Sequence, residues 1–307
     1  MRRFAHVPCL RFGSAMPRAA WRRRGRWNFL LRRCFVAACA CFSSPGYGVA
    51  AERTVDLELV LAVDISESMD MEEAALQRQG FIRAFRHRNV IDAIQRGRLG
   101  RIAVTYVEWG SEQYQITRVD WTEVADASSA AAFAKAIERS SAILVSYTSI
   151  SGAIAFGAQS FEGNGFRGER RIIDISGDGP NNMGASVNVA RDRAVADGIT
   201  INGLPIITDR PNIYGYPLMP DLDLYYEDCV IGGPGAFIVV ADGFKDFARA
   251  ILRKLVTEIA GRASPLYLLR LAAARPRSPC NAGEVQHQRW LEKWLKSYRP
   301  PVPLYDF

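Results

Sequence analysis

Residues with oxygen-bearing side chains follow three apolar runs of this sequence. A carboxylate and two hydroxyls occupy alternate positions after the run 57–63, in the segment Asp64-Ile65-Ser66-Glu67-Ser68. A hydroxyl at Thr148 and a carboxylate at Asp178 stand in two later segments. Such oxygens are hard donors, which suit Mg²⁺, Mn²⁺ or Ca²⁺ better than Zn²⁺ or Cu²⁺. We therefore predict one site for a divalent cation, most simply Mg²⁺, formed by five residues: Asp64, Ser66, Ser68, Thr148 and Asp178.

Each of these residues has a simpler interpretation when it is taken alone. The Asp64–Ser68 segment could be an ordinary helix cap, with Ser68 or Asp70 starting a helix at Met71. Thr148 could cap the helix that follows it, and Asp178-Gly179-Pro180 is an ordinary turn. The evidence lies in their combination and order. Asp174 is a rival carboxylate, but it lies within an apolar strand, whereas Asp178 lies past the end of that strand and before a glycine.

The elements that must position these oxygens alternate between strand and helix from residue 56 to residue 260. Apolar runs typical of buried strands are separated by segments of helical periodicity. The pattern predicts an α/β fold with a doubly wound, mainly parallel sheet and helices on both faces. We expect strands at 57–63, 101–109, 114–119, 171–176, 199–204 and 236–240, and helices at 72–85, 125–138, 151–161, 186–196 and 244–259.

Ligands of open parallel sheets gather at the carboxyl ends of the strands, so the predicted oxygens should share one rim. The long irregular segment Pro205–Met219 follows a strand that ends at this rim, and it is either part of the ligand surface or a variable loop. We predict that further side chains support the cation or line the rim: Glu67, Trp109, Asn181, Asn182, Arg210 and Tyr214, with Asp209, Asn212 and Tyr216 also exposed there.

These motifs resemble those of a known family. The von Willebrand factor type A (vWA) domain carries a metal-ion-dependent adhesion site (MIDAS) written Asp-x-Ser-x-Ser, then a distant Thr, then a distant Asp. Asp64-Ile65-Ser66-Glu67-Ser68, Thr148 and Asp178-Gly179 match it in order. The resemblance covers about residues 55–260. The runs LQRQGF, RIAVTYVEW, RRIIDISGDGPNN and GITINGLPI are similar to a bacterial branch of that fold, domain of unknown function 1194 (DUF1194).

The resemblance implies a role for each matching residue. Ser66, Ser68 and Thr148 would offer hydroxyl oxygens to the ion, and Asp64 and Asp178 would bind it directly or through water. One coordination position would stay open for an Asp or Glu of a partner protein. Glu67 is a departure, because the family often has glycine at that position. The implied function is a metal-dependent protein-binding module.

An enzyme is the alternative hypothesis. Asp64 at a strand end also suits the nucleophile of a metal-dependent phosphohydrolase. Nucleophiles of that type commonly have a second carboxylate two residues later, and here that residue is Ser66. A serine hydrolase is less well supported, because the sequence has no G-x-S-x-G segment.

The distribution of charge argues against nucleic acid as a partner. The whole chain has 307 residues and a net charge of +7. Residues 1–51 carry ten arginines and no acid, and residues 261–307 are also basic, whereas residues 52–260 carry 21 basic and 29 acidic residues. The central domain is therefore acidic and lacks the basic excess needed to neutralise phosphates.

The two ends suggest export and a separate extension. An Arg-rich stretch, a short apolar run at 34–42 and small residues up to Ala51 have the order of a secretory signal peptide, with Met16 as a possible alternative start. We expect cleavage near Ala51 and a periplasmic or secreted protein. We expect residues 261–307 to form a basic extension that contains one amphipathic helix at 284–298. Contact with a membrane would involve this extension alone. Cys229 and Cys280 remain after cleavage, and we expect two free thiols rather than a bridge.

Overall fold

A computed structural model describes residues 51–140, 143–210, 215–261 and 277–297. The predicted signal segment, apart from Ala51, and the rim residues Asn212 and Tyr214 lie outside the described residues. Within the ranges that are described, no helix combines the length and apolar character needed to cross a membrane.

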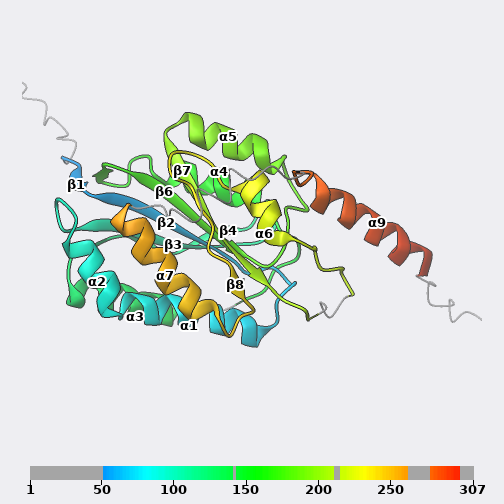
Figure 1. Ribbon diagram of the computed structural model, residues 1–307, viewed down its shortest axis with the longest axis horizontal. Helices are drawn as coiled ribbons and strands as arrows, with labels where there is room; N and C mark the ends of the chain where they lie inside the picture. Colours follow the sequence, from blue (N-terminus) through cyan, green and yellow to red (C-terminus); the bar gives the residue numbers. More distant parts are fainter. Residues whose placement is uncertain (1–50, 141–142, 211–214, 262–276, 298–307) are drawn as a thin grey trace, which may run out of the picture. The chain divides into compact units, whose positions relative to one another are not determined.

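A six-stranded sheet forms the centre of the domain, in the order β4-β3-β2-β6-β7-β8 (Figure 1). Neighbouring strands are parallel except for β3 and β4, which pair antiparallel at one edge. A separate short pair joins β1 and β5 in parallel. The strands are β1 (Arg53–Val55), β2 (Leu57–Asp64), β3 (Ile102–Trp109), β4 (Gln115–Val124), β5 (Phe166–Gly168), β6 (Arg171–Gly177), β7 (Ile199–Ile207) and β8 (Ala241–Asp242).

Helices cover both faces of the sheet, which confirms the predicted doubly wound α/β class. In Figure 1, α1, α2, α3 and α7 lie along one face, and α4 and α5 lie along the other. The described helices are α1 (Met71–Phe85), α2 (Arg88–Gln95), α3 (Ala127–Arg139), α4 (Ile150–Ser160), α5 (Val187–Ala196), α6 (Leu222–Tyr225), the π-helix η1 (Tyr226–Val230), α7 (Phe247–Ala260) and α9 (Ala282–Ser297).

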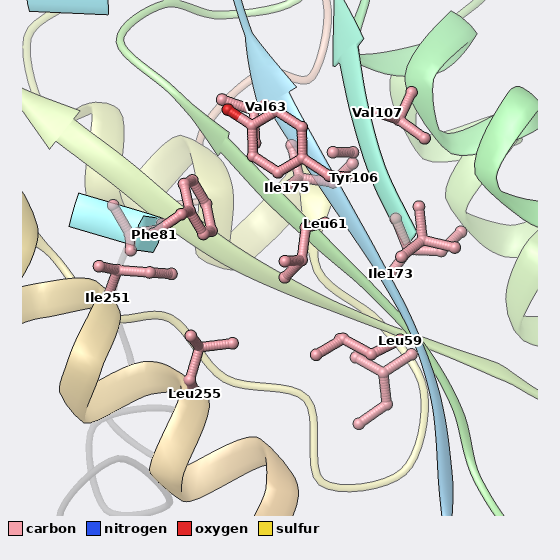
Figure 2. Close-up of a cluster of buried hydrophobic side chains, with 14 of the residues drawn as sticks. Leu59, Leu61, Val63, Phe81, Tyr106, Val107, Ile173, Ile175, Ile251 and Leu255 are labelled. Carbon is pink, nitrogen blue, oxygen red and sulfur yellow. The ribbon is translucent and has the colours of Figure 1, made fainter. Parts of the chain in front are cut away.

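Strand β2 is the centre of the core because every one of its eight residues is buried. Alternate side chains of a strand point to opposite faces, so a strand between two helical layers must be apolar on both. Figure 2 shows Leu61 on the side of Ile251 and Leu255 of α7, and Val107 on the opposite side of the sheet. Phe81 of α1 packs edge-on against Tyr106 of β3, with ring centroids 5.4 Å apart.

Helix α1 begins immediately after the Asp-x-Ser-x-Ser segment because Asp70 caps it. The Asp70 side chain accepts a hydrogen bond from the Glu73 amide at 2.8 Å, and the Asp70 amide donates to Glu73 Oε2 at 3.0 Å. This reciprocal capping box stabilises the first turn. It fixes the point at which the chain leaves the rim of the sheet and enters the helical layer.

The predicted strand at 236–240 is wrong in extent. The edge strand β8 has only two residues, Ala241 and Asp242, and the chain before it touches β7 through isolated bridges at Gly232 and Ile238. Turn-forming glycines keep this segment irregular: Gly233 and Gly235 both have positive φ. Periodicity also missed α2, whose N-cap is His87, and the continuous helical segment formed by α6 and η1.

The expectation of two free thiols is also wrong. Cys229 in η1 and Cys280, just before α9, form a disulfide with their Cα atoms 5.3 Å apart. Fifty-one positions separate them in sequence. They come within bonding distance only because residues 278–280 pack against η1, which is why sequence spacing did not indicate the pair.

Asp174, the rival carboxylate of β6, belongs to a buried ionic cluster rather than to the rim. Lys254 Nζ of α7 lies 2.6 Å from Asp174 Oδ1 and 2.5 Å from Glu258 Oε1, and all three side chains are fully buried. Asn202 also donates to Glu258 Oε1 at 2.8 Å. Burial, with the nearby charge of Asp174, raises the pKa of Glu258 to about 7. One lysine therefore balances the acids between α7 and the sheet.

Removing that lysine should destabilise the fold. We expect Lys254→Met to lower the free energy of unfolding by about 3–5 kcal/mol in urea denaturation at pH 7, because it leaves Asp174 and Glu258 buried without a cation. Lys245→Met is the matched control, since Lys245 is exposed just before α7 and should change stability by less than about 0.5 kcal/mol. Equal losses in both variants would contradict this account.

Candidate metal centre

The Asp64–Ser68 segment is held in place by backbone hydrogen bonds on both sides. The Ser66 amide donates to Asp64 Oδ1 at 2.7 Å, which folds the segment back on its own carboxylate. The Ile65 amide donates to the Trp109 carbonyl at the end of β3, and the Val145 amide donates to the Ile65 carbonyl, each at 2.9 Å. These bonds continue the sheet to Ile65, so the hydroxyls of Ser66 and Ser68 lie at its rim.

The loop before α4 brings Thr148 to the same rim. The Thr148 amide donates to Asn182 Oδ1 and the Asn182 amide donates to the Thr148 carbonyl, each at 2.9 Å. The Ser149 amide donates to the Gly110 carbonyl at 2.7 Å, and Ser149 also caps α4. Tyr147 has φ +69°, a left-handed conformation that costs a bulky residue energy and needs surrounding contacts to persist.

Four of the five predicted oxygen donors meet around one opening. Ser66 Oγ lies 2.7 Å from Ser68 Oγ, and Ser68 Oγ donates to Asp178 Oδ1 at 2.5 Å. Thr148 lines the same opening as Ser66, Ser68 and Asp178. Asp64 lies beneath them and is fully buried. The structure thus brings the five residues together from the ends of β2 and β6 and from the loop before α4.

The two oxygens of the buried Asp64 carboxylate are not equally satisfied, because only Oδ1 accepts the hydrogen bond from the Ser66 amide. Asp64 Oδ2 has no hydrogen-bond partner among the described residues. Gly177 allows Asp64 to approach β6, because a Cβ at residue 177 would lie 2.8 Å from Asp64 Oδ2 and 3.0 Å from the Tyr226 hydroxyl. A buried charged oxygen without a partner costs several kcal/mol, so it indicates a group that a cation would satisfy.

The electrostatics at this centre also favour a cation. Burial, followed by the charge of Asp178, raises the pKa of Asp64 well above its usual value. Burial raises the pKa of Asp178 to about 6, and the charge of Glu73 adds to this shift while the hydrogen bond from Ser68 opposes it. Two buried carboxylates with elevated pKa values are poorly stabilised as anions. A bound cation would stabilise their ionised forms.

The donor set fits a hard divalent ion. Among the described residues no group of three or more His, Cys, Asp and Glu side chains could hold a metal. An ion at this centre would therefore depend on two carboxylates assisted by neutral hydroxyls. That composition suits Mg²⁺ or Mn²⁺ far better than an ion that needs imidazole or thiolate ligands.

Two residues that the sequence analysis missed support the centre. Gln77 of α1 donates to the Asp64 carbonyl at 2.8 Å and accepts from Ser176 Oγ at 3.3 Å, so it links the ends of β2 and β6. Tyr226 is fully buried, and burial together with the charges of Asp64 and Asp178 raises the pKa of its hydroxyl. Only the helical segment after residue 221, which periodicity did not reveal, places Tyr226 there.

The predicted rim residues have different positions. Glu67 and Asn182 line the opening, and Glu67 Oε2 accepts from Ser146 Oγ at 2.8 Å. Asn181 is fully buried, where its Oδ1 accepts from the Ser151 amide at 2.9 Å. Trp109 is also fully buried, so it supports the site through its carbonyl and is not part of a ligand rim.

Arg210 lies beside the capped start of α1 rather than in the opening. Its guanidinium donates to Glu73 Oε1 at 3.1 Å and lies 3.7 Å from Asp70 Oδ2. Arg210 is largely exposed, which makes this pairing weak. It partly offsets the negative charge of Glu73 near Asp178.

The irregular segment predicted at Pro205–Met219 starts later in the structure, because Pro205–Ile207 still belong to strand β7.

The comparisons with known proteins agree with this architecture. The family model described as "Protein of unknown function (DUF1194)" matches residues 54–263. The chain belongs to the DUF1194 family. No curated protein matches its sequence.

Solved structures share the fold at low sequence identity. Proximal thread matrix protein 1 from the mussel byssus has a TM-score of 0.51 and 15% identity, covering 68% of this chain and 48% of that one. A von Willebrand factor type A structure from Catenulispora acidiphila has a TM-score of 0.46 and 16% identity, covering 69% and 43%. This DUF1194 chain has the vWA fold and spans about half the length of the mussel protein. At such identities the likeness concerns the fold alone.

The close approach at Gly177 provides a test of the geometry. We expect Gly177→Ala to lower the free energy of unfolding by about 1–3 kcal/mol, because the new methyl group would be forced against Asp64 Oδ2. Gly179→Ala is the matched control, since its Cβ would lie 3.8 Å from Thr148 Oγ1, an ordinary contact. Urea denaturation measures both, and a greater loss in Gly179→Ala would refute the assigned packing.

The elevated carboxylate pKa values predict how stability changes with pH. Between about pH 4 and pH 6 the folded, cation-free protein binds more protons than the unfolded chain, because the pKa of Asp178 is about 6 when folded. Its free energy of unfolding should therefore fall as the pH rises through this window. Glu258 contributes a fall of the same sign up to about pH 7.

Added Mg²⁺ should counteract the part of this fall that arises from Asp178. We expect Mg²⁺ to raise the melting temperature at pH 7 and to have little effect at pH 4, where protons compete for the carboxylates. Asp178→Asn should remove the Mg²⁺ effect and leave the fall due to Glu258. An equal Mg²⁺ effect at both pH values would show that the ion binds elsewhere.

Proposed function

We propose that this DUF1194 protein is a cation-dependent protein-binding module, in which a divalent ion links the rim of the sheet to an acidic side chain of a partner. The observation that carries the proposal is the unpartnered Asp64 Oδ2, buried beneath Ser66, Ser68, Thr148 and Asp178. Mg²⁺ is the ion we favour, with Mn²⁺ and Ca²⁺ as alternatives.

The residues of the centre would have different roles in holding the ion. Asp64 and Asp178 would supply the negative charge that holds the ion, and three hydroxyls would supply neutral oxygens. Gln77 and Asn182 would keep the loops in register through their bonds to Asp64 and Thr148. When bound, the ion supplies a positive charge that attracts a carboxylate. Because the three hydroxyl donors are neutral, they do not add negative charge that would repel the carboxylate of the partner.

A phosphohydrolase is the second candidate, and the burial of Asp64 counts against it. A nucleophilic carboxylate must reach its substrate, but Asp64 is fully buried and does not line the opening. Binding of an acidic partner requires only that the ion be accessible.

We further propose that the protein acts in the periplasm or outside the cell. The Cys229–Cys280 disulfide supports this, because structural disulfides persist mainly in oxidising compartments. Cleavage near Ala51 would release a binding domain at 52–260 with the extension 261–307. The acidic domain supports a protein partner rather than nucleic acid, with membrane contact confined to the extension.

Replacement of Asp64 by its neutral isostere tests cation binding. In Asp64→Asn the side-chain oxygen can still accept from the Ser66 amide, and a buried charge is removed. We expect the cation-free variant to be at least as stable as the parent. With Mg²⁺ at a hundred times its Kd, the parent should gain about 2.7 kcal/mol and the variant should gain nothing.

Asp70→Asn is the matched control for this experiment. It removes one carboxylate charge six residues later, and asparagine caps helices as well as aspartate does. Its Mg²⁺ response should equal that of the parent. Titration calorimetry and thermal unfolding give the readouts, and a full Mg²⁺ response in Asp64→Asn would disprove the proposed site.

Capture of a partner separates binding from catalysis. Immobilised protein should retain an envelope protein with Mg²⁺ present and release it in EDTA, and Asp178→Ala should retain none. The same preparations are assayed with phosphate esters and Mg²⁺. Metal-dependent turnover that Asp64→Asn abolishes would favour the hydrolase instead.

A further inference from the structure

The N-terminal part of helix α9 lies against the candidate metal centre, whereas residues 292–297 are exposed. Asn181 Nδ2, next to the Thr148 loop, donates to Glu284 Oε1 at 2.8 Å. Gln286 Nε2 donates to the carbonyls of Pro217 and Leu218 at 3.0 and 3.1 Å. Packing at the first turn is close, because a Cβ at Gly283 would lie 2.0 Å from the Asn181 carbonyl oxygen.

The start of α9 is fixed covalently as well. The Cys229–Cys280 disulfide joins the chain before α9 to η1, and the Ser278 amide donates to Asp228 Oδ2 at 2.7 Å. Tyr226 is the first residue of η1, and its buried hydroxyl and Asp64 Oδ2 both lie close to Gly177. The same helical segment therefore supports the metal centre and anchors α9 beside it.

Four rings form a continuous surface where α9 faces the rim, which we call the aromatic wall: Tyr147, Tyr216, His287 and Trp290. The His287 ring lies 5.4 Å from Tyr147 and 5.8 Å from Tyr216, centroid to centroid. Trp290 lies 5.7 Å from Tyr216 and stacks on His287 at 5.9 Å. Tyr147 immediately precedes the predicted ligand Thr148, so the wall reaches the candidate metal centre.

The aromatic wall and the metal centre enclose one cleft of about 280 Å³. Ser66, Ser68, Thr148 and Asp178 form one side, and the aromatic wall with Leu218 and Leu291 forms the other. Its volume is at the small end of the range for ligand pockets. A cleft of this size takes two neighbouring side chains of a peptide more readily than the broad face of a folded domain.

The wall carries no charge at neutral pH. Burial lowers the pKa of His287, which keeps the imidazole neutral, and burial raises the pKa of Tyr216 to about 12. Among the described residues that line the cleft, Glu67 and Asp178 carry carboxyl groups, and the carboxyl of Glu67 would repel a second acid. The two sides thus favour different groups: a single carboxylate at the ion and an uncharged, apolar group at the wall.

We propose that the cleft binds a peptide segment in which an Asp or Glu adjoins a large aromatic or aliphatic residue, with the acid at the cation and the apolar side chain against the aromatic wall. This specificity rests on the proposed function, because the acid needs the ion. It assigns to α9 the role of choosing which acidic segment binds. Aromatic anchors that fill desolvated pockets commonly dominate the energy of such interfaces.

Fluorescent tetrapeptides test this specificity with the full chain and Mg²⁺. One carries Phe next to Asp, one carries Ala next to Asp, and one carries Phe next to Asn. Fluorescence anisotropy should show the Phe-Asp peptide binding about tenfold more tightly than the Ala-Asp peptide, the effect of burying one large apolar side chain. The Phe-Asn peptide should not bind.

Leu291→Ala and Leu295→Ala are the matched pair for the wall. Leu291 lines the cleft, whereas Leu295, one turn further along α9, is 62% exposed and lies outside it. We expect Leu291→Ala and Trp290→Ala to lose most of the tenfold preference while retaining weak binding of Ala-Asp. Leu295→Ala should behave as the parent, and unchanged Mg²⁺ stabilisation shows that each variant is folded.

The outcomes separate the two proposals. If the parent binds Phe-Asp and Ala-Asp equally and Asp64→Asn binds neither, the proposed function stands and the aromatic specificity is overturned. If Asp64→Asn binds Phe-Asp as well as the parent does, the cation-dependent function itself fails. Mg²⁺-dependent self-association without peptide binding, abolished by Leu291→Ala, would overturn the peptide and identify a second copy of the chain as the occupant.

Discussion

The forced proximity of two carboxylates at the rim of a parallel sheet is the constraint on which the rest of the site depends. β2 and β6 are neighbours at the centre of the sheet, and each ends in an aspartate or immediately before one. Gly177 lets the two strand ends approach closely enough for Asp64 to be completely buried. The free energy cost of these two buried charges is what makes the rim a candidate cation site.

The surrounding structure can be understood as support for that arrangement. Gln77 holds the ends of β2 and β6 together from α1, and Asn182 holds the Thr148 loop by two hydrogen bonds. Glu73, whose charge raises the pKa of Asp178, is engaged by the cap of α1 and by Arg210. Asp174, by contrast, is neutralised by Lys254 on the face of α7. Asp174, within β6, and Asp178, just past its end, thus have different partners: Lys254 in the core and Ser68 at the rim.

The extension adds a second chemical character to the opening. Without α9 the rim would present hydroxyls and a carboxylate to solvent. With α9 in place, the same opening has an aromatic side, anchored by a disulfide and by the Asn181–Glu284 hydrogen bond. The sequence predicted an amphipathic helix in this extension but not these contacts, because an amphipathic pattern does not specify which surface the helix covers.

The sequence by itself determined the fold class, the order of most elements and the candidate donor set, because these depend on local patterns. Apolar runs such as 57–63 indicate buried strands, and oxygen-bearing residues that follow them must lie at strand ends. Tertiary structure alone decided which strands are neighbours, and hence that Asp64 and Asp178 are buried close together at the rim that the parallel pattern predicts. It also decided the Cys229–Cys280 pair, the approach of Tyr226 and the position of α9. Each of these is a contact between residues distant in sequence, set by packing across the whole domain and not by the residues nearby.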